Sequence, residues 1–306
     1  MGLSIHLVFH KEQSMAQYCG FPSTSIENEF LRVELLSAGA MRVAGLYLAG
    51  VAHNLLGELD LKVPTPYGDY PLVGGHRLWH APEAMPRTYL PEDPQPQVEN
   101  LPFGIRIRQA AEAQSGIRKT MELRLLPGRA ALTIDHTLEN TGIWPVECAP
   151  WAITLMPLGG TVFFPLRDRE VTSFLPDRQL VVWPYSHLSD ERLHWGDDQL
   201  RVLAKPMLPP LKLGTFNSLG WLAYFRDGVL FRKSFTPMPG RPHVDMGCNA
   251  EIYNSDRILE LESIAPLTVL QPGESVGHRE TWDVTHLPDV QMDAEGLRKI
   301  EALLRP

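Results

Sequence analysis

The chain has few cysteines, no long apolar runs and no excess of positive charge. Only three cysteines occur among 306 residues, and no C-x-x-C pair is present, so neither a disulfide framework nor a cysteine zinc site is expected. Cys19, Cys148 and Cys248 are therefore predicted to be buried free thiols. No apolar run approaches the roughly 20 residues that a membrane helix needs. The formal charge of −8 offers no basic surface, so neither nucleic acid nor a membrane is expected as a partner.

An export signal and long helices are lacking as well. The apolar stretch over residues 3–9 is interrupted by polar residues and follows no basic segment, which predicts a cytoplasmic protein. Between the apolar runs there is no helical pattern of roughly 10 to 15 residues, which argues against doubly wound and TIM-barrel folds. A single helix is predicted over residues 293–304, where Asp293 can cap the start and apolar residues follow at helical spacing, at Leu297, Ile300 and Leu304.

The chain does contain many short runs that alternate between apolar and polar residues. Half-buried strands have this period, and it occurs over residues 31–36, 105–108, 121–125 and 132–139. Further strands, rich in aromatic and branched residues, are predicted over residues 151–155, 219–225, 228–235, 258–264 and 280–284. The 24 glycines and 27 prolines supply turns between them. We therefore predict an all-β fold of large antiparallel sheets, in one domain over residues 1–306 whose first 20 residues fit no pattern.

The segment 62–104 contains nine prolines and is predicted to be a long ordered loop, a kind of segment that is usually functional. Behind two glycines it carries His76, Arg77, Trp79 and His80. An aromatic ring can pack on the CH face of a sugar, while arginine and histidine can bind its hydroxyls. The alternative is that the tryptophan belongs to the core and the histidines to the surface. Two histidines four residues apart can also bind zinc on a helix, but the accompanying glutamate base is missing, so a metal site stays a minority alternative and no metal or cofactor is predicted.

Three other motifs carry weaker signals. Glu260 and Glu262 project from one face of a predicted strand, where two carboxylates could raise the pKa of one of them and make it a general base, or could simply face solvent. His243 and Asp245 form a weaker pair of candidate ligands. Residues 273–277 match the G-x-S-x-G pattern of hydrolases, but a Pro-Gly turn between two strands is the wrong context for a nucleophile elbow.

Three stretches of the sequence are similar to the galactose-mutarotase-like superfamily, and most similar to its uncharacterised members. They comprise residues 28–35 with Gly39, residues 74–79 with Pro82 and Glu83, and residues 245–253, 259–263, 270–275 and 280–282. The resemblance implies a supersandwich, a large antiparallel two-layer β fold whose concave face holds a sugar.

The resemblance also implies roles for individual residues. In the epimerases of this superfamily a glutamate removes the anomeric hydroxyl proton and a histidine protonates the ring oxygen. By position Glu262 would be the base, with Glu260 as the rival, and His76 would be the acid. The other residues expected at the sugar are Arg77, Trp79, His80, His243, Asp245, Asn249, Glu251 and Glu260.

This chain departs from the epimerases at residues 150–155, which contain no histidine where those enzymes have a second one on a middle strand. His243 or His80 could substitute for it. The leading hypothesis is a carbohydrate-binding protein that acts as an aldose 1-epimerase-like isomerase without a cofactor. One alternative is a non-catalytic carbohydrate-binding module. Another is a glycoside hydrolase or lyase, and hydrolysis would require two carboxylates roughly 5 to 9 Å apart across a cleft.

Overall fold

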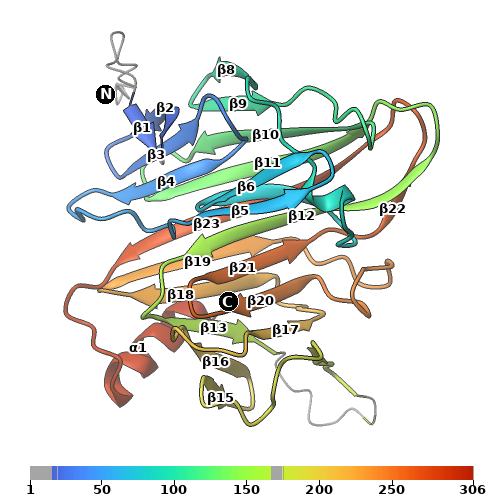
Figure 1. The fold of residues 1–306 in the computed structure, drawn as a ribbon. Coiled ribbons are helices and arrows are strands. Elements are labelled where there is room, and N and C mark those ends of the chain that lie inside the picture. Colours follow the sequence, from blue (N-terminus) through green and yellow to red (C-terminus); the bar gives the residue numbers. More distant parts are fainter. Residues whose placement is uncertain (1–15, 19, 167–173, 175, 306) are drawn as a thin grey trace.

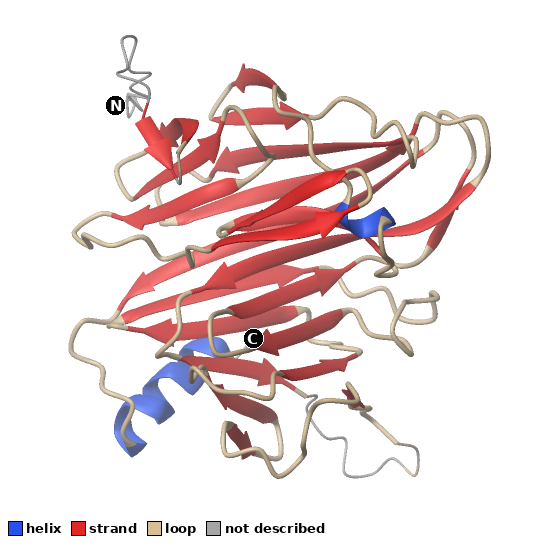
Figure 2. Cartoon of the chain, in the orientation of Figure 1, coloured by secondary structure: helices blue, strands red, loops and turns tan. Residues whose placement is uncertain are grey.

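Two large antiparallel sheets face each other in the computed structural model, which describes residues 16–18, 20–166, 174 and 176–305 (Figure 1). Strands form nearly all of the regular structure in the described part of the chain (Figure 2). The prediction of an all-β fold is therefore confirmed. Cys19 and most of the first 20 residues lie outside the described residues.

The first sheet has 11 strands, paired in the order β1-β2-β3-β4-β7-β12-β21-β20-β17-β14, with β22 also paired to β12. Its strands are β1 (Ala16–Tyr18), β2 (Phe21–Glu27), β3 (Leu31–Leu36), β4 (Val43–Leu48), β7 (His76–Ala81), β12 (Val146–Met156), β14 (Val181–Val182), β17 (Leu211–Thr215), β20 (Ala250–Asn254), β21 (Leu259–Ile264) and β22 (Thr268–Leu270).

The second sheet has 10 strands, in the order β15-β16-β13-β18-β19-β23-β11-β10-β9-β8. Its strands are β8 (Gln97–Leu101), β9 (Gly104–Arg108), β10 (Ile117–Leu125), β11 (Ala131–Asn140), β13 (Thr161–Pro165), β15 (Leu193–Trp195), β16 (Gln199–Leu203), β18 (Trp221–Arg226), β19 (Val229–Phe235) and β23 (Ser275–His286).

The main core lies between the two sheets. It joins apolar side chains of the first sheet, such as Leu78 and Leu261, to side chains of the second, such as Leu123 and Trp282. Alternation along each strand sends every second side chain into this layer. The remaining side chains of the first sheet form its outer face, which points away from the second sheet.

A two-stranded hairpin covers part of that outer face. It consists of β5 (Asp60–Thr65) and β6 (Gly68–Val73), and in Figure 1 it lies in front of the first sheet. Tyr70 and Leu72 of the hairpin pack in one apolar cluster with Trp79 and Ile153 of the sheet. Because both faces are covered, every residue of β7 and β21 is buried.

The prediction of a long loop over residues 62–104 is wrong. The segment contains most of the hairpin, strands β7 and β8, and the single turn η1 (Arg87–Tyr89). Pro64 and Pro71 are tolerated in the hairpin because a two-stranded sheet consists entirely of edge strands. Five of the nine prolines do lie in irregular chain, in the connection 82–96 between β7 and β8, so the loop prediction holds only for that part of the segment.

The C-terminal helix is confirmed as α1 (Ala294–Leu304). The carboxylate of Asp293 accepts hydrogen bonds from the backbone N–H groups of Glu295 and Gly296, which satisfies two donors of the first turn. Ile300 and Leu304 pack against the outer face of the second sheet. None of the helices in the described part of the chain has the length and apolar character that crossing a bilayer requires.

Two further predictions are confirmed. Cys148 and Cys248 are buried free thiols. Ser275 of the G-x-S-x-G match begins β23, which pairs antiparallel with β11 and β19, so no strand-to-helix elbow forms around it.

Candidate functional site

Two glycines position the first residues of β7. Gly75 has φ +79°, and a Cβ built on it would lie 2.1 Å from the carbonyl oxygen of Val43. A Cβ on Gly74 would lie 2.0 Å from the carbonyl oxygen of Gly57. Only glycine permits this close passage, which brings β7 between β4 and β12.

From that start the side chains of β7 alternate between the two faces of the sheet. Arg77 and Trp79 point to the outer face, where each lies opposite a residue of β12 that shares the face, Ile153 and Trp151 respectively. His76, Leu78 and His80 point inward.

The prediction that His76 meets Glu262 across one hollow is wrong. His76 has no exposed surface, and its Nδ1 lies 2.9 Å from Oγ1 of Thr154 between the sheets. Glu262 lies opposite Ile153, which in turn lies opposite Arg77, so the glutamate belongs to the outer face. Because His76 and Arg77 are neighbours in a strand, they cannot point to the same side.

His80 also lies away from the outer face. Its Nε2 is 3.3 Å from Oε2 of Glu112, a carboxylate that also contacts Lys119 Nζ at 2.6 Å. Burial lowers the pKa of His80, which keeps the ring neutral. The expectation that His80 contacts a sugar beside Trp79 is not met, since the two side chains leave the strand in opposite directions.

The segment 242–249 also stays outside the hollow described below. The Nδ1 of His243 lies 2.9 Å from the carbonyl oxygen of Arg241, and Asp245 occupies a left-handed turn at φ 49°. Asn249 is buried and exchanges two hydrogen bonds with the backbone of Asn217. The structure therefore gives Asn249 a structural role.

A hollow of about 430 Å³ opens on the outer face of the first sheet. Much of its surface is aromatic, from Trp79, Tyr89, Trp151, Tyr185 and Tyr253. Its polar lining includes Arg77, Lys212 and Glu260. No histidine lines it among the described residues.

One continuous stretch of chain, residues 59–89, builds a large share of this hollow. The hairpin contributes Leu61, Val63 and Leu72, and β7 contributes Arg77 and Trp79 to the floor. The segment after β7 contributes a wall of Glu83, Met85 and Tyr89. In this wall the Tyr89 hydroxyl donates a short hydrogen bond to Glu83.

Arg77 and Glu260 form a buried ion pair in the floor. Nη2 of Arg77 lies 2.8 Å from Oε1 of Glu260, and the guanidinium lies 4.1 Å from the centroid of the Trp79 ring. Arg77 is 2% exposed and Glu260 is 8% exposed. Nε and Nη1 of the guanidinium have no hydrogen-bond partner in the described part of the chain, so this arginine retains unused donors.

Lys212 of β17 lines the hollow as well, although no motif in the sequence indicated it. Its Nζ lies 2.8 Å from Oε2 of Glu251 and 3.3 Å from Oε2 of Glu262. The ammonium group also faces the rings of Trp151 and Trp183, at 4.9 and 4.8 Å from their centroids. The sequence offers a weak signal for it, because Lys212 alternates with leucines at 211 and 213 as a solvated strand residue would.

Burial governs the protonation of this group. Burial raises the pKa of Glu262, and Lys212 opposes the rise. Burial likewise raises the pKa of Glu251 well above its usual range. Burial alone would lower the pKa of Lys212, but Glu262 and Glu251 outweigh it and hold the pKa well above its usual value. If the two carboxyl groups share one proton, their single negative charge balances the positive charge of the ammonium group.

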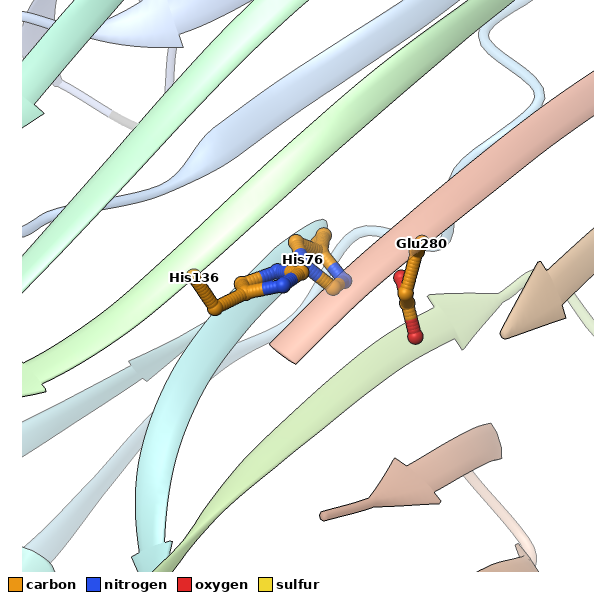
Figure 3. A group of neighbouring side chains, drawn as sticks. All are labelled: His76, His136 and Glu280. Atoms are coloured by element: carbon orange, nitrogen blue, oxygen red, sulfur yellow. Dashed lines mark hydrogen bonds between the residues drawn. The ribbon is translucent and has the colours of Figure 1, made fainter. Parts of the chain in front are cut away.

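Behind β7, His76 and His136 point toward each other beside Glu280 (Figure 3). Their Nε2 atoms are 2.7 Å apart. The Nδ1 of His136 lies 2.9 Å from the carbonyl oxygen of His278 and must donate to it, so His136 Nε2 accepts the proton of His76 Nε2.

This arrangement is satisfied without a metal ion. Lys233 Nζ lies 2.7 Å from Oε1 of Glu280 and supplies the positive charge that the carboxylate needs. Burial alone would raise the pKa of Glu280, but the ammonium group of Lys233 outweighs it and keeps the carboxyl ionised. His76 and His80 cannot act together either, because they are four positions apart along a strand, a separation of about 13 Å.

Comparison with protein-family models finds no match, and comparison with curated proteins finds none at a significant level. Several solved structures resemble the chain. A TPR-domain containing protein from Parabacteroides distasonis matches with a TM-score of 0.60 and 13% identity, over 90% of this chain and 49% of that one. The chain thus spans about half the length of that protein.

Two other structures match over most of both chains. A candidate aldose 1-epimerase from Klebsiella pneumoniae has a TM-score of 0.56 and 11% identity, over 93% of this chain and 83% of that one. A galactose mutarotase-like protein from Lactobacillus casei has a TM-score of 0.54 and 10% identity, over 86% of this chain and 100% of that one. At such identities the likeness concerns the fold. The chain has the galactose mutarotase-like fold.

Proposed function

We propose that the protein binds a carbohydrate in the hollow on the outer face of the first sheet. One observation carries the proposal: aromatic rings and buried ionic groups share a single cavity of about 430 Å³. This volume lies in the range of about 300 to 1,000 Å³ that is usual for small-molecule sites. Two proteins of the same fold are named for aldose and galactose chemistry, which supports a sugar as the ligand.

The chemistry of the lining fits a sugar ring. Tyr89, Tyr185 and Tyr253 are partly exposed and offer apolar faces for the CH groups of a pyranose. Glu260 and Lys212 lie in the floor, where they can exchange hydrogen bonds with hydroxyls. Neither a metal nor a cofactor is needed for such binding.

Binding can be measured directly by saturation-transfer NMR and calorimetry with D-glucose, D-galactose and D-mannose. We expect at least one hexose to bind, and we expect Tyr253→Ala to weaken it. Tyr67→Ala is a suitable control because Tyr67 is an exposed tyrosine outside the hollow. Absence of binding by every hexose and by their short oligosaccharides would refute the proposal.

Aldose 1-epimerase-like isomerisation is the second candidate. It is favoured by the Lys212, Glu251 and Glu262 group, which holds two carboxylates of raised pKa beside the hollow. Glu262 would be the base and a protonated Glu251 the acid, in place of His76. Glu251 and Glu262 have no exposed surface and do not line the hollow, so contact with a sugar requires the side chains that cover them to move aside.

NMR of freshly dissolved α-D-glucose or α-D-galactose separates the two functions. An epimerase would accelerate the approach to anomeric equilibrium, and Glu262→Gln would abolish the acceleration while binding persists. Binding without acceleration would leave a carbohydrate-binding protein. Hydrolysis is disfavoured, because Glu251 and Glu262 contact the same ammonium group instead of facing each other across a cleft.

A further inference from the structure

Every buried cation of the hollow already has a carboxylate partner. Arg77 pairs with Glu260 at 2.8 Å, and Lys212 lies between Glu251 and Glu262 at 2.8 and 3.3 Å. An anionic group on a ligand is normally held by an arginine or lysine with free donors and uncompensated charge. Among the residues that the structure describes, the floor of this hollow offers no such cation.

The charge of the whole lining leads to the same result. Three cations line the hollow, Arg77, Lys212 and the exposed Arg257, and three carboxylates line it, Glu83, Asp256 and Glu260. Glu251 and Glu262 lie against Lys212 in addition. Even with one proton shared by those two carboxylates, the described residues of the site carry no excess positive charge to attract a phosphate.

Glu260 is the residue on which this balance depends. Arg77 lies in the floor, its planar guanidinium is held against Trp79, and two of its nitrogens lack partners, so without Glu260 it would suit a phosphate or carboxylate. Glu260 is the only carboxylate that forms an ion pair with Arg77 among the described residues.

We propose that Glu260 is a specificity-determining residue, which occupies Arg77 and thereby restricts the hollow to sugars without phosphate or carboxylate groups. That the ligand is a sugar rests on the proposed function, but the exclusion of anions can be tested by itself.

The decisive variant is Glu260→Gln, which keeps the size of the side chain and releases the charge of Arg77. Calorimetry with inorganic phosphate and with D-glucose 6-phosphate should show at least a 10-fold gain of affinity over the wild type. Glu83→Gln is the matched control, because it removes a carboxylate of the same lining for which the described residues supply no cation partner. This control should show no comparable gain. The double variant Arg77→Met with Glu260→Gln should lose the gain again.

The outcomes separate the two proposals. Wild-type protein that binds D-glucose 6-phosphate as tightly as D-glucose would overturn the role of Glu260. So would a folded Glu260→Gln variant with no gain for either anion, where thermal unfolding establishes that it is folded. A gain for phosphate in Glu260→Gln, together with no binding of neutral sugars by the wild type, would uphold the exclusion of anions and refute the proposed function.

Discussion

Glu251 and Glu262 lie directly opposite each other on neighbouring strands, and both carboxylates contact the ammonium group of Lys212. Side chains in such cross-strand positions have Cβ atoms about 5 Å apart, so two ionised carboxylates would repel strongly in this buried setting. The ammonium group and a shared proton relieve the repulsion. The protonation of this group therefore links the stability of the fold to pH.

Replacing Glu251 by glutamine should flatten one part of that pH dependence. The pKa of Glu251 is raised in the folded protein, so its contribution is complete below the unfolded value of about 4.3 and is lost as the pH rises. In the wild type this group lowers the unfolding free energy as the pH rises from 5 to 8. In Glu251→Gln that decrease should be smaller by about 1 to 3 kcal/mol. Urea unfolding at both pH values measures it, with the exposed Glu29→Gln as the control.

Removing the ammonium group should have a larger effect. Lys212→Met leaves two buried carboxylates without a cation, and loss of one partner from a buried pair costs about 3 to 5 kcal/mol. The loss should be smaller at pH 5 than at pH 8, since the carboxylates can take up protons. Lys205→Met, which breaks an exposed pair with Glu191, should cost less than about 1 kcal/mol. Equal losses in the two variants would contradict the buried position of Lys212.

The inner histidines should make the protein sensitive to acid. Burial lowers the pKa values of His76 and His136, and it lowers the pKa of His278 to about 3. Because the unfolded chain binds protons near pH 6.5 and the folded chain does not, stability is complete above that pH and is lost as the pH falls. Each histidine contributes a slope of about 1.4 kcal/mol per pH unit.

His278→Gln should remove one such slope between pH 6 and pH 4, measured by chemical unfolding at a series of pH values. The exposed His194→Gln serves as the control and should retain the wild-type slope. An unchanged slope in His278→Gln would show that this ring is not buried in its neutral form.

Tyr253 should contribute to sugar affinity without supporting the fold. Its ring lines the hollow and is only partly buried, so Tyr253→Ala leaves no closed cavity in the core. A ring contact of about 0.5 to 1.5 kcal/mol corresponds to a loss of roughly 2- to 12-fold in affinity. Calorimetric titration with the hexose that binds the wild type measures this, and thermal unfolding of the same variant verifies the fold.

Strand periodicity predicted which side chains share one face of a strand, but not which residues of different strands contact each other at the site. Glu260 and Glu262 do share one face, as their spacing indicated. Whether that face is buried or exposed to solvent could not be predicted, because alternation along a strand does not distinguish the two. In the structure β21 is covered on both sides. Arg77 and Glu260 are 183 positions apart in the sequence. Their ion pair depends on the order of strands in the sheet, which periodicity does not predict.

The misplacement of His76 has a definite physical cause. Treating residues 74–80 as a loop allowed His76 and Arg77 to point into the same hollow, whereas in a strand their side chains must diverge. The nine prolines of the segment favoured the loop interpretation. Of the four candidate residues in this segment, only Arg77 and Trp79, which are two positions apart and share one face of the strand, line the hollow.

The hairpin, β7 and the wall after it follow one another along the chain and line the same hollow. Insertions or substitutions within about 30 consecutive positions, residues 59–89, can therefore reshape the entrance, the floor and one side together, while the pairing of the distant strands stays intact. Libraries aimed at altered recognition can therefore begin with that stretch, and a second set of positions on the opposite side of the hollow, residues 253–260, remains available for independent variation.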